Sequence, residues 1–195
     1  MFNEFTKQLL PALRMLLVLT VLTGILYPVA ITLAAGVIFP YQANGSLEKQ
    51  NDQVIGSALI GQSFASDRYF WPRPSAVSYN PLPSGATNLG PTSAALKQQM
   101  DERAAAIRAA NKLPDDAVIP TDLLFASASG LDPHISPDAA RLQINRIAAA
   151  RGFTPDQTAK LTSLVDDFTE SPQLGFLGQP RVNVLLLNIA LDGLE

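Results

Sequence analysis

The chain has 195 residues, of which 47% are hydrophobic and 16% are charged, and its formal net charge at pH 7 is −3. A chain with a net negative charge is repelled by the phosphate backbone of nucleic acids, so nucleic acid is not an expected partner. With no cysteine and one histidine, the sequence excludes disulfides, thiolate zinc sites, a cysteine nucleophile and the two-histidine motif HExxH.

Residues 15–47 carry no charged side chain, and the most apolar part of this stretch is Leu16–Phe39. A helix of these 24 residues spans ~36 Å, enough to cross a hydrocarbon core of ~30 Å. A cleaved signal peptide is the alternative, but its apolar core has only ~7 to 15 residues. We therefore predict a transmembrane helix over residues 15–39.

The charges on either side of this helix predict its direction. Lys7 and Arg14 precede it, whereas the charged residues that follow do not add up to a positive charge. Positive residues stay on the cytoplasmic side of the membrane. We therefore expect residues 1–14 in the cytoplasm and residues 40–195 outside it, with a linker at about 40–53.

One face of the predicted membrane helix repeats small or weakly polar residues at steps of four. These residues are Thr20, Gly24, Pro28, Thr32 and Gly36. Faces of this kind let two membrane helices approach closely and let threonine hydroxyls bond across the contact. We expect a membrane partner on this face, with chance composition as the alternative, and a kink at Pro28.

The first part of the outer region is predicted to be extended and then irregular. Val54–Phe64 mixes β-branched residues with glycines, which indicates strands or extended segments. Residues 72–91 contain five prolines, which favours a loop without regular structure. Four aromatic residues lie in or beside it: Tyr69, Phe70, Trp71 and Tyr79. They favour a loop packed by its own rings, with a ligand or partner surface as the alternative.

Helices dominate the second half of the predicted domain. An alanine-rich helix is expected over Thr92–Asn111, followed by a strand candidate at Ala117–Ser127. The last apolar stretch, Val182–Leu191, is too short to cross a membrane and is expected to form a buried helix, with Asn183 as a candidate cap.

Two helices between these segments carry clear start signals. Ser136 can cap a helix with Pro137 in its first position, and Gly152 is placed to end it. Thr154 can cap the next helix, with Gln157 placed to close a capping box. The apolar stripe of that helix is expected at Leu161, Leu164, Val165 and Phe168.

The sequence has no motif for nucleotide binding, a nucleophile elbow or a calcium loop. His134, in the stretch SGLDPHISP, is the one candidate for acid–base chemistry near neutral pH. A Ser-His-Asp site would have to combine it with Asp132 and Ser129 or Ser136, which residues so close in sequence rarely permit. A turn at Gly130 that leads into a capped helix is the favoured interpretation.

Several motifs follow one another along the chain. They are LIGQSF (59–64), YFWPRPSA (69–76), YNP (79–81), SGATNLGP (84–91), ASASGLDPHISP (126–137), RVNVL (181–185) and LNIALD (187–192). In this order, after a single membrane helix, they resemble KdpC, the family of C subunits of Kdp potassium-transporting P-type ATPases. One stretch departs from it: many relatives have histidine and arginine where this chain has Phe168 and Pro172.

The resemblance implies a non-catalytic accessory subunit of a high-affinity, ATP-driven potassium uptake complex in the bacterial or archaeal cytoplasmic membrane. The implied partners are a channel-like subunit that translocates potassium and a P-type subunit that hydrolyses ATP, with lipid around the helix. ATP and potassium are then handled by the complex, and no catalytic, cofactor or metal residue is expected here. The family is also described as a catalytic chaperone that raises the ATP affinity of the pump subunit.

The expected architecture is a single N-terminal transmembrane α-helix followed by one extracytoplasmic α+β domain. The positions expected to form partner-binding or structural loops are Tyr69, Phe70, Trp71, Arg73, Pro74, Tyr79, Asn80, Asp132 and His134. Two other functions remain as alternatives: an anchored outer hydrolase centred on His134, and an anchored binding module that uses the aromatic residues. An outer domain cannot touch cytoplasmic ATP, so a chaperone effect would have to pass through the membrane helices.

Overall fold

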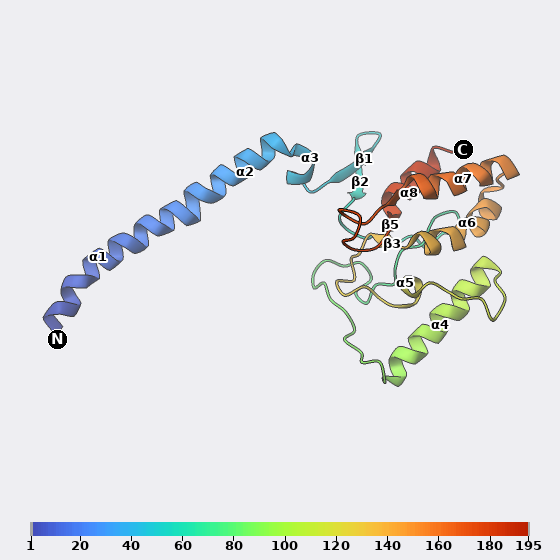
Figure 1. The fold of residues 1–195 in the computed structure, drawn as a ribbon, viewed down its shortest axis with the longest axis horizontal. Coiled ribbons are helices and arrows are strands. Elements are labelled where there is room, and N and C mark those ends of the chain that lie inside the picture. Colours follow the sequence, from blue (N-terminus) through green and yellow to red (C-terminus); the bar gives the residue numbers. More distant parts are fainter. Residues whose placement is uncertain (1, 195) are drawn as a thin grey trace. The chain divides into compact units, whose positions relative to one another are not determined.

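A computed structural model describes residues 2–194, and the chain divides into two units between Leu47 and Glu48. The first unit is almost entirely helical (Figure 1). Its elements are α1 (Phe2–Val21), the π-helical turn η1 (Leu22–Leu26), α2 (Tyr27–Ile38) and the short α3 (Pro40–Ala43). The helix thus starts well before the predicted membrane segment.

The stretch Thr6–Ile38 is long and apolar enough to cross a membrane, with 33 residues and none of its most apolar window buried inside the protein. At ~1.5 Å per residue it is ~50 Å long, so it exceeds a ~30 Å hydrocarbon core. The helix ends at Ile38 because Pro40 disfavours helical geometry at Phe39, whose φ and ψ are −130° and 60°.

The π-helical turn lies directly before Pro28, where the sequence indicated a kink. Proline has no amide hydrogen, so the α-helical ladder is interrupted there. The backbone N–H of Tyr27 instead donates to the carbonyl of Leu22, five residues earlier. A π turn holds more residues than an α turn. Residues four apart in the sequence, such as Thr20, Gly24 and Pro28, therefore lie closer to one line along the helix than they would in a regular α-helix.

The second unit is an α+β domain. It contains the hairpin strands β1 (Leu47–Gln50, which begins at the unit boundary) and β2 (Gln53–Ser57), then α4 (Ala94–Asn111), α5 (Thr121–Leu124), β3 (His134–Ile135), α6 (Pro137–Arg151), α7 (Pro155–Asp167), β4 (Thr169–Glu170), β5 (Arg181–Asn183) and α8 (Val184–Asp192). The stretch expected to be a linker therefore holds α3 and β1. Asn51 and Asp52, both with positive φ, form the two-residue hairpin turn.

A small antiparallel sheet, in the order β3-β5-β4, lies against the C-terminal helices (Figure 1). Val182 in the central strand is opposite both Ile135 and Thr169, and its side chain is fully buried. Helix α7 contacts both α6 and α8, and β5 contacts α6 and α8. The core residues lie where these elements meet: Phe70, Ile107, Ile135, Ile147, Leu161, Val165, Val182, Leu187 and Leu191.

The predicted helix termini are confirmed. The hydroxyl of Ser136 accepts the amide of Ala139, and α6 ends at Gly152. Thr154 and Gln157 form the complete capping box of α7, and Asn183 caps α8. The expected apolar stripe of α7 also faces the core: Leu161 and Val165 are fully buried, and Leu164 and Phe168 pack against the same cluster.

The strand predicted at Ala117–Ser127 is wrong, because the structure has the single helical turn α5 there. In a strand, the backbone carbonyls of this segment would accept hydrogen bonds from a neighbouring strand. Here arginine side chains bind two of these carbonyls. Arg108 donates to Ala117, and Arg103 donates to Leu124. The prediction over Val54–Phe64 is confirmed only as far as Ser57, after which the chain turns.

The irregular stretch 58–93 contains no helix or strand, as expected for residues 72–91. Buried side chains of α6 and α8 replace the missing backbone pairing. Asn188 accepts from the amide of Phe70 and donates to its carbonyl, at 2.8 and 3.0 Å. Gln143 does the same for Trp71, at 2.7 and 3.2 Å. Both backbone groups of Phe70 and of Trp71 are therefore hydrogen-bonded, although no neighbouring strand is present.

Candidate functional site

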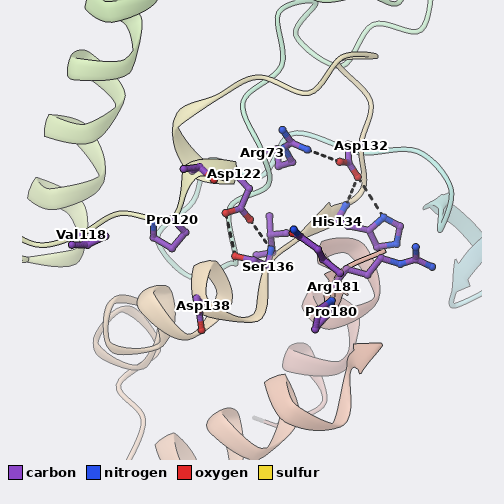
Figure 2. A pocket seen from close by; sticks show the side chains of 13 residues that line it. Arg73, Val118, Pro120, Asp122, Asp132, His134, Ser136, Asp138, Pro180 and Arg181 are labelled. Atoms are coloured by element: carbon purple, nitrogen blue, oxygen red, sulfur yellow. Dashed lines mark hydrogen bonds and ion pairs between the residues drawn. The ribbon is translucent and has the colours of Figure 1, made fainter. Parts of the chain in front are cut away.

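The stretch SGLDPHISP borders a cleft with a volume of about 680 Å³ (Figure 2). The cleft is lined by Arg73, Val118, Pro120, Thr121, Asp122, Asp132, His134, Ile135, Ser136, Asp138, Gln179, Pro180 and Arg181. Of the loop positions singled out in the sequence, this cleft brings together Arg73, Asp132 and His134. The aromatic positions lie elsewhere.

Two glycines fix the course of this stretch. Gly130 has a φ of +71°, and a Cβ there would meet Val77 Cγ2 at 2.5 Å. Gly61, from the motif LIGQSF, donates its amide to Leu131 at 2.7 Å, and a Cβ there would meet the Asp132 carbonyl at 2.6 Å. Two motifs that are far apart in sequence thus pack backbone against backbone, which only glycine permits.

Asp132 is the electrostatic centre of the cleft wall (Figure 2). Its carboxylate accepts from the amide of His134 at 3.0 Å and from Nη1 of Arg73 at 2.9 Å, and Nδ1 of His134 lies at 3.4 Å. Burial disfavours the charged carboxylate, but the hydrogen bonds from His134 and the Arg73 guanidinium outweigh it and lower the pKa of Asp132 to about 2. The carboxylate therefore stays ionised and holds the loop to Arg73.

A second carboxylate, Asp122 on α5, holds the start of α6. It accepts from the amide and the hydroxyl of Ser136, at 2.6 and 3.1 Å. The Ser136 hydroxyl in turn accepts from the amide of Ala139 at 3.1 Å. Sequence reasoning missed Asp122 because it lies in the stretch predicted as a strand. No sequence pattern relates it to Ser136, 14 residues away.

The geometry does not assemble the Ser-His-Asp arrangement considered from the sequence. The Ser136 hydroxyl donates to Asp122, and the Ser129 hydroxyl accepts from the amide of Leu131. His134 contacts Asp132, so the three residue types are joined in separate pairs. Within residues 2–194, no group of three or more metal-ligating side chains is arranged to hold an ion. The polar contacts of this cleft fix the loops around it.

The aromatic positions are chiefly structural. Phe70 is fully buried, and Tyr69 packs against the core with its hydroxyl donating to Asp192 at 3.2 Å. The ring of Trp71 lies 4.0 Å below the guanidinium of Arg146. Their interpretation as loop-packing residues agrees with this arrangement.

Three further positions named from the sequence hold the loop together. The Tyr79 hydroxyl donates to the carbonyl of Arg73 at 2.6 Å, and burial raises the pKa of Tyr79 to about 12. Pro74 accepts the amide of Ser127 at 3.2 Å. Asn80 is exposed and accepts the amide of Leu82. Each residue closes a turn or ties the loop to a neighbour.

Sequence reasoning missed the buried polar residues that hold this loop, above all Arg146. Its side chain is 3% exposed, and it donates to the carbonyls of Asp67 and Tyr69 and to the side chains of Asn111 and Gln143. Burial lowers the pKa of Arg146 to about 10, although Asp67 acts in the opposite direction. A polar residue within an apolar run, such as Asn188 in LNIAL, is the signal that could have shown such a role.

Comparison with known proteins agrees with the motifs placed above. A family model described as KdpC, K+-transporting ATPase, c chain, matches residues 9–193. The chain belongs to the KdpC family. The match includes most of the long apolar helix and nearly the whole α+β domain, so the resemblance found in the sequence is confirmed over both units.

Individual KdpC proteins are similar over nearly their full length. The potassium-transporting ATPase KdpC subunit of Geobacter sulfurreducens is 50% identical over 192 residues, which cover 96% of this chain and 98% of that protein. The KdpC subunit of Geotalea uraniireducens is 47% identical over 193 residues, 97% and 99% of the two chains. That of Mycobacterium bovis is 49% identical over 190 residues, 96% and 99%.

Proposed function

We propose that this KdpC chain is a membrane-anchored accessory subunit of an ATP-driven potassium uptake complex, in which it assists assembly and transport. The observation that carries the proposal is the family match over residues 9–193, which joins a helix able to span a membrane to a complete α+β domain. Relatives similar along nearly the whole chain are named potassium-transporting ATPase KdpC subunits. The chain is accordingly expected in the bacterial or archaeal cytoplasmic membrane.

The proposed partners are a channel-like subunit that translocates potassium and a P-type subunit that hydrolyses ATP. The small-residue face of the membrane helix, Thr20 to Gly36, is the proposed contact within the bilayer. In support, a Cβ on Gly24 would have only Thr20 Cγ2 at 4.0 Å as a neighbour, and one on Gly36 would have none within 4 Å. This face therefore has room for the close approach of another helix.

The outer domain is proposed to act as a rigid docking body near the potassium entrance. Its long irregular stretch is held by buried side chains of α6 and α8, which supports a surface of fixed shape. A fixed surface loses little conformational entropy when it binds a partner. Arg73, Asp132 and His134 are the proposed structural centre of this surface.

The catalytic-chaperone effect is proposed to be indirect. With the N-terminus in the cytoplasm and the α+β domain outside, the domain cannot reach cytoplasmic ATP. A rise in the ATP affinity of the pump subunit then requires coupling through the membrane helices. Such coupling predicts that the complete chain lowers the ATP concentration for half-maximal hydrolysis, whereas the chain without residues 1–38 does not.

Deletion of the gene tests the proposed role in uptake. Cells that keep the other subunits but lack this chain are expected to lose high-affinity potassium uptake, and the complete chain should restore it. Uptake that is unchanged by the deletion would overturn the proposal.

The proposed topology has a separate test. Because the natural chain has no cysteine, Ser84→Cys introduces a single thiol at an exposed loop position. A membrane-impermeant maleimide should label it in intact cells if the outer membrane, where present, is made permeable. Labelling only after the cytoplasmic membrane is opened would show that the orientation is reversed.

A further inference from the structure

Two of the uncharged segments of the α+β domain are in contact at their bases. Residues 53–66 and 171–180 contain no Asp, Glu, Lys, Arg or His. Nδ2 of Asn183, just after the second segment, donates to the carbonyl of Ala58 in the first at 2.7 Å. Apolar side chains are exposed on both: Val54, Leu59, Ile60, Leu174, Phe176 and Leu177.

The 171–180 loop presents its apolar side chains from an ordered turn. Gln173 and Leu177 exchange backbone hydrogen bonds at 3.0 and 2.9 Å. Between them, Leu174 has a φ of +53°, a conformation that is rare for a bulky residue. Leu174 is 82% exposed and Phe176 is 75% exposed. Neither side chain therefore contributes appreciably to the core, and both can contact an apolar surface outside the domain.

The length of the connection to the membrane helix limits how far the start of the domain can lie from the end of that helix. Helix α2 ends at Ile38 and β1 begins at Leu47, so eight residues separate them. At no more than ~3.6 Å per residue, they span at most ~30 Å. The domain therefore stays close to the bilayer surface, on whichever side of the membrane it lies.

We propose that the 171–180 loop inserts Leu174, Phe176 and Leu177 into the interface of the bilayer that holds α1 and α2, with the 53–66 segment beside it. A lipid interface accepts apolar side chains to a depth of ~5–10 Å, and an uncharged loop brings no ionic group that must lose its water. The inference rests on the membrane helix, and it requires neither partner subunit.

A fluorescent probe at the loop tests this contact in the full-length chain. Leu174→Cys and, separately, Phe176→Cys are labelled with an environment-sensitive dye and reconstituted into phosphatidylcholine–phosphatidylglycerol vesicles, some with nitroxide on the lipid headgroups. Leu82→Cys is the matched control, because Leu82 has the same side chain and the same 82% exposure. Its loop lacks the contact with Asn183. Unchanged unfolding midpoints in detergent verify that each variant is folded.

Both loop probes are expected to show blue-shifted emission and strong quenching by the headgroup nitroxide, while the control emits as in water and is not quenched. Equal quenching at positions 174 and 82, or none at 174 and 176, overturns the proposal. A blue shift that appears only when the other transport subunits are present, without lipid quenching, also overturns it and assigns the loop to a protein contact. Neither result depends on whether the chain is needed for potassium uptake, so the two proposals fail separately.

Discussion

Asp132 illustrates how single residues stabilise the cleft. The guanidinium of Arg73 and the His134 amide bind its carboxylate, and its pKa is about 2, below the ordinary value of 3.8. A group with a lowered pKa contributes stability that is fully present above its unfolded pKa and is lost as the pH falls toward its folded pKa. The contribution of Asp132 is therefore constant above about pH 5 and decreases between about pH 4 and 2.

Replacement of Asp132 tests this contribution. Asp132→Asn is expected to lower the free energy of unfolding by about 1–2 kcal/mol at pH 7, after allowance for partial exposure. The difference from the unchanged protein should shrink as the pH falls below about 4. Urea unfolding of the full chain in detergent from pH 7 to pH 3 measures it, with the exposed Asp115→Asn as the control. A difference that does not depend on pH would refute the ion pair as its cause.

Arg146 allows a sharper comparison, because Arg141 lies on the same helix and is exposed. Arg146→Met removes a buried guanidinium that binds two loop carbonyls, and the expected loss of stability is about 3 kcal/mol. Arg141→Met breaks the surface pairs with Asp138 and Asp166 and should cost under about 1 kcal/mol. Thermal unfolding measures both. Equal losses would show that Arg146 does not hold the loop.

Among the elements, the long helices and strand β2 were predictable, whereas the short helix α5 and the strands of the three-stranded sheet were not. The termini of α6, α7 and α8 are encoded locally by Ser136, Thr154 and Asn183, so the sequence predicts them without knowledge of the fold. Strands β3, β4 and β5 have only two or three residues. They pair residues as distant in sequence as Ile135 and Val182. The local sequence therefore has no periodic pattern from which these strands could be predicted.

The candidate site was only partly predictable for a related reason. Asp132 and His134 stand out because they are two residues apart in a turn motif. Asp122 reaches Ser136 only because α5 forms where a strand was expected. Gln143, Arg146 and Asn188 act on the backbone of a loop about 70 to 120 residues away. Such contacts depend on the tertiary fold and are not visible in local sequence.

The membrane helix has its own test. Gly24→Leu fills the small-residue face without an internal clash, because the nearest neighbour of its Cβ is 4.0 Å away. We expect this change to reduce recovery of the partner subunits with the purified chain. Ala30→Leu adds comparable bulk two residues after Pro28, on a different side of the helix, and should leave recovery unchanged. Equal recovery for both variants would contradict the proposed contact face.

In the whole molecule, a 33-residue stretch that is long and apolar enough to cross a membrane precedes a domain with a cleft bordered by mutually paired side chains. The region matched by the KdpC family, residues 9–193, covers most of both units. An anchor and a rigid, loop-rich domain suit a subunit that acts by binding other subunits. The proposed contact of the exposed apolar loop at 171–180 with the bilayer does not depend on those partners.

Purification through a tag on the chain in mild detergent is the sharpest test of the proposal that this chain works as part of a potassium-transporting complex. A channel-like subunit and a P-type ATPase subunit are expected to elute with it, and the eluate should hydrolyse ATP faster when potassium is added. A folded chain that elutes alone, while those subunits assemble and transport potassium without it, would overturn the proposal.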